Sequence, residues 1–352
     1  MKRQMSAGSC MGELTGFSVA VALILGMTAS SIAASELPAS VKALFPAAKA
    51  EGTLFVFGRS VKPRQNKEFQ KALSKFYGFP IKLKMKGGSH NQKAAQVMQS
   101  VKNNVPTSID IFWTSYNTSV RLEKANAFRK FDWTGTFGLP KTLKSSEYGL
   151  RSHDVSLFLV SYNTKQVKAA DRPKSYEDLL NPKWKGKIAM PRSTTPWIYL
   201  TRAIGEDKTT SLLTRILDKQ KVKILPRFSN IRSAVASGEF AIGIGSDAFI
   251  QIRKGAPVAH AKMTPMPVSA WGFHILKDAK NPNLAKLWGY WIATPDGQNA
   301  LKTIDALARV TTEGGELWKL AQNNEIKTLT RAYIAKNGKR LSIKYKKIIG
   351  IR

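Results

Sequence analysis

The strongest constraint on the fold is a repeated alternation of short apolar runs with helical stripes, which begins near residue 53. An apolar run over 53–57 is followed by residues at the spacing of one helix face, namely Phe69, Ala72, Leu73 and Phe76. A strand at 81–85, a helical stripe over 94–101 and a strand at 109–113 continue the order. This β-α-β-α-β order predicts a mostly parallel sheet with helices on its faces.

The same alternation starts again after a looser stretch, rich in Gly and Pro, that follows Trp133. Strands are expected at 156–162, 187–190, 221–225, 240–244 and 271–276, and helices near Pro196 and Asn230. Asn281-Pro282 and Thr294-Pro295 each place Pro at the first position of a further helix. The sequence therefore predicts two α/β lobes, with helices toward the C-terminus.

The first 34 residues have the pattern of a secretory signal peptide. Basic residues open the chain, an apolar run covers 17–27, and small residues follow at Ser31, Ala33 and Ala34. An uncleaved anchor is the alternative, because residues 14–34 are long enough to span a thinned bilayer. The one cysteine, Cys10, precedes the apolar run, so cleavage would leave a protein without a disulfide. We therefore expect an exported, periplasmic protein.

The chain is strongly basic, with 56 Lys and Arg residues against 23 Asp and Glu and a formal net charge of +33. Such a charge favours anionic partners, among them phospholipid head groups and nucleic acid. The basic residues are nevertheless spread along the chain, and Lys82, Lys84 and Lys86 alternate with apolar residues as the wet face of a strand. Only 336–352 resembles a basic tail. The distribution indicates a solvated surface and no specific nucleic-acid site.

Three segments carry a resemblance to a known family. They are "SYNTKQVKAADRPKSYEDLLNPKWKGKIAMP" at 161–191, "SGEFAIGIG" at 237–245 and "NPNLAKLWGYWIATPDGQNAL" at 281–301. With these segments in this order, the sequence resembles periplasmic solute-binding proteins of ABC transporters, in the iron(III)-type subgroup with the type II periplasmic-binding-protein fold.

The resemblance implies two α/β lobes joined by a hinge of two crossing segments, 156–163 and about 265–273. Lobe 1 would comprise 35–155 together with 265–352 and its C-terminal helices, and lobe 2 would comprise 163–264. Such a protein, acting as a monomer, closes over a solute in the cleft between its lobes and delivers the solute to a membrane permease.

The loop before the helix near Pro196 carries three candidate ligand-binding residues, Ser193, Thr194 and Thr195. Short hydroxyl residues at a helix start leave backbone N–H groups and hydroxyls facing outward, which suits an anion. A simple N-terminal cap is the alternative. The resemblance implies the binding role, because the matching loop of relatives faces the cleft.

The first lobe offers similar loops at the carboxyl ends of its three strands, where ligands bind in open α/β sheets. The candidates there are Gly58, Arg59, Ser60, Gly88, Ser89, His90, Thr114, Ser115 and Tyr116. Gly88 lets the backbone approach a ligand, Ser89 can donate at a helix start, and Arg59 can pair with a carboxylate or phosphate. An ordinary turn and a surface arginine are the alternatives. Further candidates are Ser246, Asp247 and Trp271, the last with a place in the core as its alternative.

The residues favour neither ferric iron nor catalysis. Iron-binding members of the family use adjacent tyrosines after the strand at 240–244, whereas this chain has Ser246 and Asp247 there and no Tyr-Tyr pair. A metal stays open, with Asp247 as a ligand and Tyr116, Tyr162 and His90 as helpers. The four histidines lack zinc-like spacing, and the G-x-G-x-x-A match at 243–248 lacks the acidic residue of a dinucleotide site. We expect no cofactor and no enzyme activity.

The expected function is the solute-binding component of an ABC importer that captures a small anion, such as an organic acid, a phosphate ester or a phosphonate. Ferric iron or a metal–anion complex is the alternative ligand within the same transporter class. A periplasmic sensor partner would share the fold and the pocket. A basic adhesion or nucleic-acid-binding protein is the alternative from a different class.

Overall fold

The computed structural model describes residues 37–245 and 247–351, which belong to one compact unit. The predicted signal peptide at 1–34 and the candidate Ser246 lie outside the described residues. Within the described ranges, every helix is too short or too polar to serve as a membrane span.

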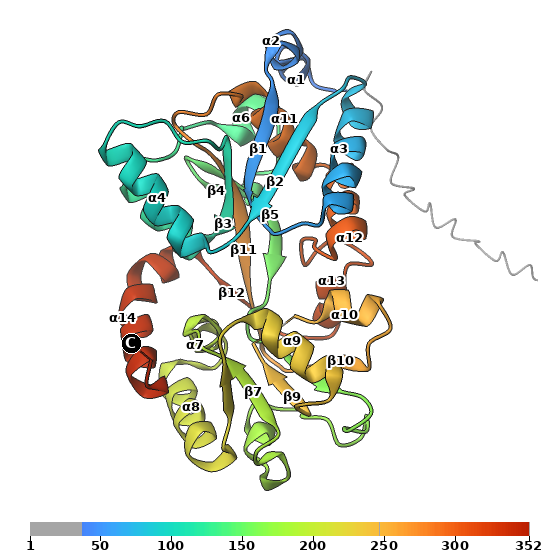
Figure 1. Ribbon diagram of the computed structural model, residues 1–352, viewed down its shortest axis with the longest axis vertical. Coiled ribbons are helices and arrows are strands. Elements are labelled where there is room, and N and C mark those ends of the chain that lie inside the picture. The colour runs from blue at the N-terminus through green and yellow to red at the C-terminus, as the bar shows by residue number, and fades with distance from the viewer. Residues whose placement is uncertain (1–36, 246, 352) are drawn as a thin grey trace, which may run out of the picture. The chain divides into compact units, whose positions relative to one another are not determined.

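Two β-sheets organise the described chain, and each lies next to its own large hydrophobic core (Figure 1). The first sheet has the order β2-β1-β3-β11-β5-β4, with β12 paired to β11. Its strands are β1 (Thr53–Gly58), β2 (Lys82–Gly87), β3 (Ile111–Ser115), β4 (Lys144–Ser146), β5 (Gly149–Val155), β11 (Met266–Ile275) and β12 (Ile326–Leu329). In β2 the exposed lysines alternate with buried Leu83 and Met85, as the sequence predicts for a strand with one wet face.

The helices of the first half form where the sequence places apolar stripes. In α3, Phe69, Leu73 and Phe76 are buried, Pro63 occupies the first turn, and left-handed Gly78 ends the helix. The helices of these segments are α1 (Ala39–Lys42), α2 (Phe45–Ala50), α3 (Pro63–Tyr77), α4 (His90–Lys102), α5 (Tyr116–Lys124), α6 (Trp133–Phe137), η2 (Lys141–Leu143), α11 (Pro282–Ala293), α12 (Pro295–Asp305) and α13 (Glu316–Ala321). A last helix, α14 (Arg331–Ile349), follows β12.

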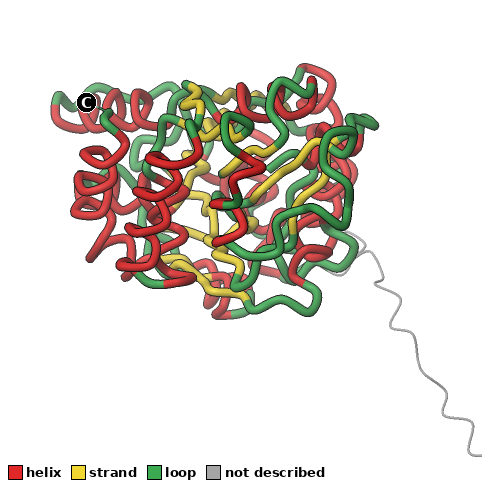
Figure 2. The backbone as a smooth tube through the Cα atoms, turned by 90° about the horizontal axis from the view of Figure 1, so that it is seen from below, coloured by secondary structure: helices red, strands yellow, loops and turns green. Residues whose placement is uncertain are grey.

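The second sheet has the order β10-β6-β9-β7-β8. Its strands are β6 (Val160–Asn163), β7 (Ile188–Pro191), β8 (Lys223–Leu225), β9 (Ile242–Ile244) and β10 (Val258–Ala261). Its helices are η3 (Glu177–Leu180), η4 (Pro182–Trp184), α7 (Thr195–Ile204), α8 (Glu206–Gln220), α9 (Phe228–Ser237) and α10 (Phe249–Arg253). Viewed from below, the strands run between helices (Figure 2).

The α/β class is confirmed, but the sheets are mixed. β1 pairs in parallel with β2 and β3, and β7 pairs in parallel with β8 and β9. β11 is antiparallel to β3 and β5, and β6 is antiparallel to β9 and β10. The prediction of a mostly parallel sheet is wrong for these strands, because the chain enters β6 and β11 directly from the other sheet, without a crossover helix.

The chain passes between the sheets at 156–159 and at 262–265, within or next to the two predicted crossing segments. It passes again after β12, because α14 packs on the core of the second sheet through Ile334, Leu341 and Tyr345. The sequence-based division placed all of 265–352 with the first lobe. Helix α14 departs from that expectation. Its three apolar residues lie on one face of the helix, and this face is buried in the core of the second sheet.

Candidate functional site

A cavity of about 270 Å³ lies between the two halves of the fold, at the starts of three helices. Helices α4 and α5 leave strands of the first sheet, and α7 leaves a strand of the second. The described residues that line the cavity are Ser89, His90, Asn91, Ser115, Tyr116, Asn117, Thr118, Leu157, Ser193, Thr195, Ile198, Tyr199, Phe228, Ser269, Trp271, Ile334 and Gly338. A larger hollow of about 620 Å³ lies elsewhere, between α5 and the start of α14, and its charged lining residues are Lys124 and the Arg331–Glu123 ion pair.

The start of α4 brings Ser89 and His90 to the cavity. Ser89 is the N-cap residue, and its hydroxyl oxygen accepts a long bond of 3.4 Å from the N–H of Gln92. The Ser89 O–H is a donor and is not used by that bond. Ser89 therefore caps α4 and also has a donor available at the cavity, whereas the sequence left an ordinary turn as the alternative for this segment.

His90 is held in one orientation by two hydrogen bonds. Its Nε2 lies 3.1 Å from the carbonyl oxygen of Gly58, and its Nδ1 lies 2.9 Å from the hydroxyl of Thr114. A carbonyl only accepts, so Nε2–H donates to Gly58, and in the neutral ring Nδ1 accepts from Thr114. Burial and the nearby charge of Arg59 lower the pKa of His90, although the bond to Gly58 acts in the opposite direction. His90 is therefore a neutral ring with both nitrogens occupied.

The start of α5 follows β3 without an intervening residue, so Ser115 and Tyr116 stand at the end of the strand. Ser115 is the N-cap residue in extended conformation, and among the described residues no side chain caps this helix. The first N–H groups of α5 therefore lack the partner that helix starts commonly have. Burial raises the pKa of the Tyr116 phenol, so it remains a neutral O–H.

The start of α7 brings Ser193 and Thr195 from the second sheet. The Ser193 hydroxyl accepts from the N–H of Thr195 at 3.3 Å and donates to the Thr195 hydroxyl at 3.2 Å. The Thr195 O–H is then left to donate elsewhere. Tyr199, one turn further along α7, also lines the cavity, and burial raises the pKa of its phenol.

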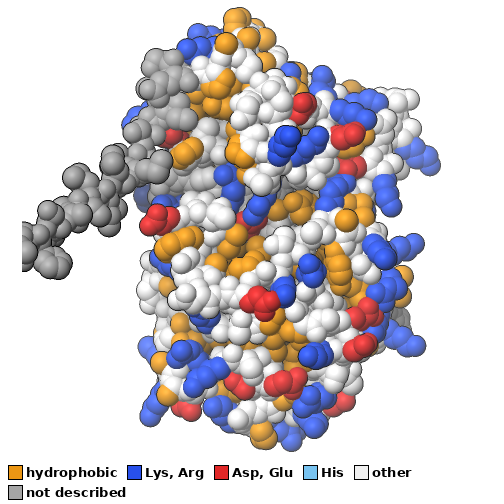
Figure 3. Space-filling model, turned by 180° about the vertical axis from the view of Figure 1, so that it is seen from behind, with side chains coloured by type: hydrophobic (Ala, Val, Ile, Leu, Met, Phe, Trp, Pro, Cys, Tyr) orange, Lys and Arg blue, Asp and Glu red, His pale blue; other side chains and the backbone are white. Residues whose placement is uncertain are grey.

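The cavity is electrically unlike the surface of the protein. Among the described residues that line it, none is Lys, Arg, Asp or Glu. On the face seen from behind, Lys and Arg side chains are spread over both halves, with Asp and Glu among them (Figure 3). Three helix starts supply positive potential to the cavity through backbone dipoles. The arrangement can therefore bind a small anion through N–H and O–H donors, without a charged side chain.

Three candidates at the end of β1 do not line the cavity. The Nε of Arg59 forms an ion pair with Oδ2 of Asp305 at 2.8 Å, so Arg59 is used within the fold. A Cβ on Gly58 would lie 2.8 Å from the Cβ of Trp113, so this glycine lets β1 and β3 approach each other. A Cβ on Gly87 would lie 2.1 Å from the backbone nitrogen of Ser60, which shows how closely this loop is packed.

Four further candidates also lie off the cavity wall. Gly88 lies against the ring of Phe57, and Thr114 is fully buried beneath His90. The Thr194 hydroxyl lies 3.1 Å from the hydroxyl of Ser342 in α14, and Asp247 forms an ion pair of 3.6 Å with Arg232. Trp271, by contrast, lines the cavity and also packs against both large cores. Its core alternative is therefore confirmed, and its contact with a solute stays a prediction.

Sequence reasoning missed several residues that line the cavity, above all Asn117, Ile334 and Gly338. Asn117 extends the Ser115-Tyr116 pair along the first turn of α5, so it could have been included with them. Ile334 and Gly338 lie on α14, most of which falls within 336–352, the segment that resembles a basic tail. The spacing of Ile334, Leu341 and Tyr345 along one helix face is the pattern that indicates a packed helix there.

The described residues do not form a metal site of the usual kind. No group of three or more His, Cys, Asp or Glu side chains within residues 37–245 and 247–351 is placed to hold a metal ion. A metal would need the lone pair on Nδ1 of His90, which Thr114 already occupies. Tyr116 and Tyr199 both reach the cavity, but burial disfavours their phenolates.

Comparisons with known proteins agree with this architecture. Residues 66–328 match the family described as bacterial extracellular solute-binding protein. A search of the curated proteins finds no match.

Several solved structures share the fold. Iron-bound HitA from Pseudomonas aeruginosa is 18% identical with a TM-score of 0.66, over 83% of this chain and 98% of that protein. AfuA from Actinobacillus pleuropneumoniae, with fructose-6-phosphate bound, is 18% identical with a TM-score of 0.68, over 86% and 99%. The Atu4243–GABA receptor is 16% identical with a TM-score of 0.62, over 84% and 97%. These periplasmic binding proteins have the two-lobed type II fold, and their ligands differ. The chain is thus a member of the bacterial extracellular solute-binding protein family.

Proposed function

We propose that this protein is the periplasmic solute-binding component of an ABC importer and that it captures a small anionic solute in the cavity between its two sheets. An organic acid, a phosphate ester or a phosphonate would fit. The observation that carries the proposal is the convergence of three helix starts on one cavity whose described lining has no charged side chain. The volume of about 270 Å³ lies just below the usual range of ligand pockets, about 300–1,000 Å³, which supports a small solute.

The donors at the cavity are of the kind that selects an anion. Ser89, Ser115 and Thr195 each place a hydroxyl at a helix start, and each helix contributes its positive end. Neutral His90 adds no charge of its own. Closure of the lobes would exclude water and strengthen these interactions by lowering the local dielectric constant.

The proposal assigns 160–261 and α14 to one moving body and the first sheet with its helices to the other. The packing of Leu341 and Tyr345 in the core of the second sheet supports the place of α14 in the first of these bodies. We further propose that residues 1–34 direct export and that the monomer delivers its solute to a membrane permease. Sequencing the N-terminus of the exported protein tests the cleavage near residue 34.

The proposal is tested by calorimetry with purified protein and a panel of carboxylates, phosphate esters and phosphonates, beside ferric chloride without an organic anion and neutral sugars. We expect one anion class to bind and to raise the melting temperature. A ligand at one hundred times its Kd adds about 2.7 kcal/mol to the free energy of unfolding.

Two variants separate the cavity from the surface. Ser115→Ala should weaken binding, because it removes a donor at the cavity, whereas Ser60→Ala should not, because Ser60 is not among the described lining residues. Binding of ferric ion without any anion, or of sugars alone, would overturn the anion preference. Salt-sensitive binding to DNA or anionic vesicles that survives Ser115→Ala would favour the adhesion or nucleic-acid alternative.

A further inference from the structure

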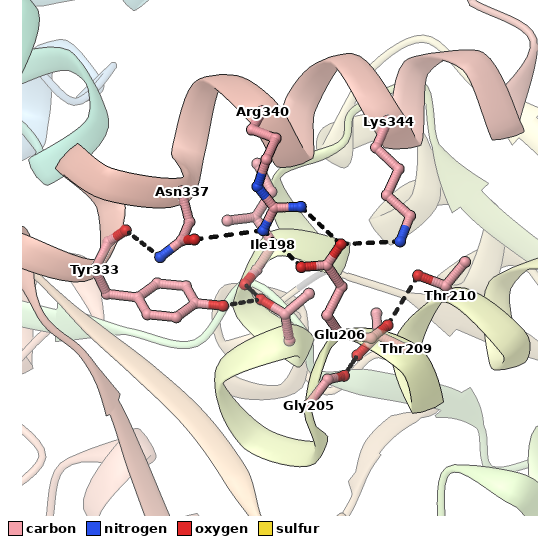
Figure 4. A network of polar contacts seen from close by, with 10 residues as sticks. Ile198, Gly205, Glu206, Thr209, Thr210, Tyr333, Asn337, Arg340 and Lys344 are labelled. Carbon is pink, nitrogen blue, oxygen red and sulfur yellow. Dashed lines mark hydrogen bonds and ion pairs between the residues drawn. The ribbon is translucent and has the colours of Figure 1, made fainter.

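Helix α14 lies beside the cavity and contacts both halves of the fold. It packs on α5 from the first half and on α7 and α8 from the second. Figure 1 shows α14 on the same side of the molecule as α8. At its start, Arg331 pairs with Glu123 of α5 and donates to Ser119 at 3.1 Å. Further along, Arg340 and Lys344 both bind Glu206 at the start of α8, at 2.6 and 2.9 Å (Figure 4). These contacts fix the position of α14 relative to the cavity.

Two residues of α14 form part of the cavity wall. Ile334 and Gly338, one turn apart, line the cavity together with Asn117 of α5. The same three residues also line a second cavity of about 430 Å³ on the outer side, between α5 and α14. The wall at this point is therefore a single layer of side chains, and Gly338 contributes none.

Neither the backbone nor the packing requires glycine at position 338. Gly338 lies inside α14 with helical backbone, outside the set of left-handed glycines. A Cβ there would lie 3.5 Å from Cγ2 of Ile334 and 3.6 Å from Oδ1 of Asn117, which are ordinary van der Waals distances. Glycine in a helix interior costs roughly 0.5–1 kcal/mol relative to alanine. The fold thus loses stability at this position and gains only the space that a side chain would fill.

We propose that Gly338 is a specificity-determining residue, which keeps the α14 side of the cavity open for the far end of the solute. This inference rests on the proposed binding of a solute in the cavity. The head of the solute lies at the starts of α4, α5 and α7, and its length toward α14 is limited by Ile334, Asn117 and the space at Gly338. Solutes that end short of α14 are insensitive to residue 338, whereas longer ones need the glycine.

The test compares Gly338→Ala and Gly338→Val with a matched control, Ala335→Val, which adds bulk to the outer side of the same helix. Gly338→Ala should unfold at a higher temperature than wild type, which excludes loss of fold as the cause of any loss of binding. Calorimetry would measure two linear series of increasing length, phosphate monoesters and neutral polyols. We expect Gly338→Val to bind short members as wild type does and to lose tenfold or more for the longest member that wild type binds. Gly338→Ala should lose less, and Ala335→Val nothing.

Equal loss at every length, or unchanged affinity throughout the series, would overturn the role of Gly338. If only polyols bind wild type, the proposed anion preference fails, but the length test still decides this inference. A measurement without solute completes the test. Positions 338 and 341 are both buried from the outer surface, but position 338 lines two cavities. In a Cys10→Ser chain, which has no other cysteine, the Gly338→Cys thiol should therefore react with methyl methanethiolsulfonate that enters a cavity, and the Leu341→Cys thiol, packed in the second core, should not. A protected thiol at position 338 would contradict the inference whatever wild type binds.

Discussion

Two kinds of loop leave the carboxyl edge of the first sheet, and only one kind reaches the cavity. After β2 and β3, helices α4 and α5 begin almost at once, at His90 and Tyr116, and their first turns line the cavity. After β1, α3 begins only at Pro63, and Arg59 in the intervening loop pairs with Asp305. All three loops have a serine at or just after the strand end, namely Ser60, Ser89 and Ser115. They differ in the length of chain between the strand and the helix.

A polar loop at the end of a strand is therefore not sufficient to bring side chains to the cavity. A helix that starts directly at the strand end aims its free N–H groups along the edge of the sheet, where a ligand binds. In a longer loop, the side chains can reach other parts of the fold and pair there. In the β1 loop, even the N–H of Lys62 donates to Gln65 at 2.9 Å.

The largest expected effect is a loss of stability in acid, caused by titratable side chains that are packed inside the fold. Like Arg59, His260 and His274 are held inside the fold, where burial lowers their pKa values to about 4 and about 3. The unfolded chain binds these protons near pH 6.5, so the unfolded state holds more protons below that pH. The free energy of unfolding should therefore be level above pH 6.5 and should fall below it, by up to about 1.4 kcal/mol per pH unit for each histidine.

Urea denaturation at a series of pH values measures this effect. His274→Gln, which removes one of the two groups, should fall less steeply than wild type. A free energy of unfolding that stays level or rises between about pH 6.5 and pH 4.5 would contradict the buried neutral state.

Removal of the partner of Arg59 is the next largest effect. The side chain of Arg59 is 27% exposed and that of Asp305 only 5%, so Asp305→Ala leaves a mostly buried cation without its partner. We expect a loss of about 3 kcal/mol in the free energy of unfolding, measured by denaturant titration. Glu68→Ala, which removes the exposed partner of Arg64, should change stability little. If Asp305→Ala were as stable as wild type and bound solute differently, Arg59 would belong with the binding loops.

The smallest effect separates two serines that occupy similar places in the sequence. Ser115→Ala should cost about 1.5–2 kcal/mol of binding to the anion identified above, a factor of roughly 10–30, because a hydroxyl donor to a charged group is lost. Ser60→Ala should leave affinity unchanged, and both variants should melt within a degree or two of wild type. The comparison between the loops fails if calorimetry finds equal losses for the two variants.

Local patterns in the sequence were enough to predict most of the fold. The stripe of Phe69, Leu73 and Phe76 predicts α3, and the alternation in 81–85 predicts β2, because burial of one face follows the period of each element. Strand β5 was missed, because the four successive residues 151–154 are polar and give neither an apolar run nor an alternation. The strand expected at 156–162 begins only at Val160.

About half of the candidate site residues line the cavity. Ser89, Ser115 and Ser193 do so, since a hydroxyl residue at a strand-to-helix junction is placed by local geometry alone. Arg59 does not, because its partner Asp305 lies 246 positions away in the chain. The place of Gly338 in the cavity wall could not be predicted for the same reason, because α5, which faces it, is remote in sequence.

The local sequence specifies which segments become strands and helices and which junctions carry hydroxyl donors, because these properties depend on neighbours a few positions apart. Three outcomes depend on the complete fold: which junctions face a common cavity, which cation forms an ion pair, and that the basic C-terminal segment is a helix in the cavity wall. Those outcomes depend on contacts between residues far apart in the chain, whose pairing is set by how the two cores close around their sheets.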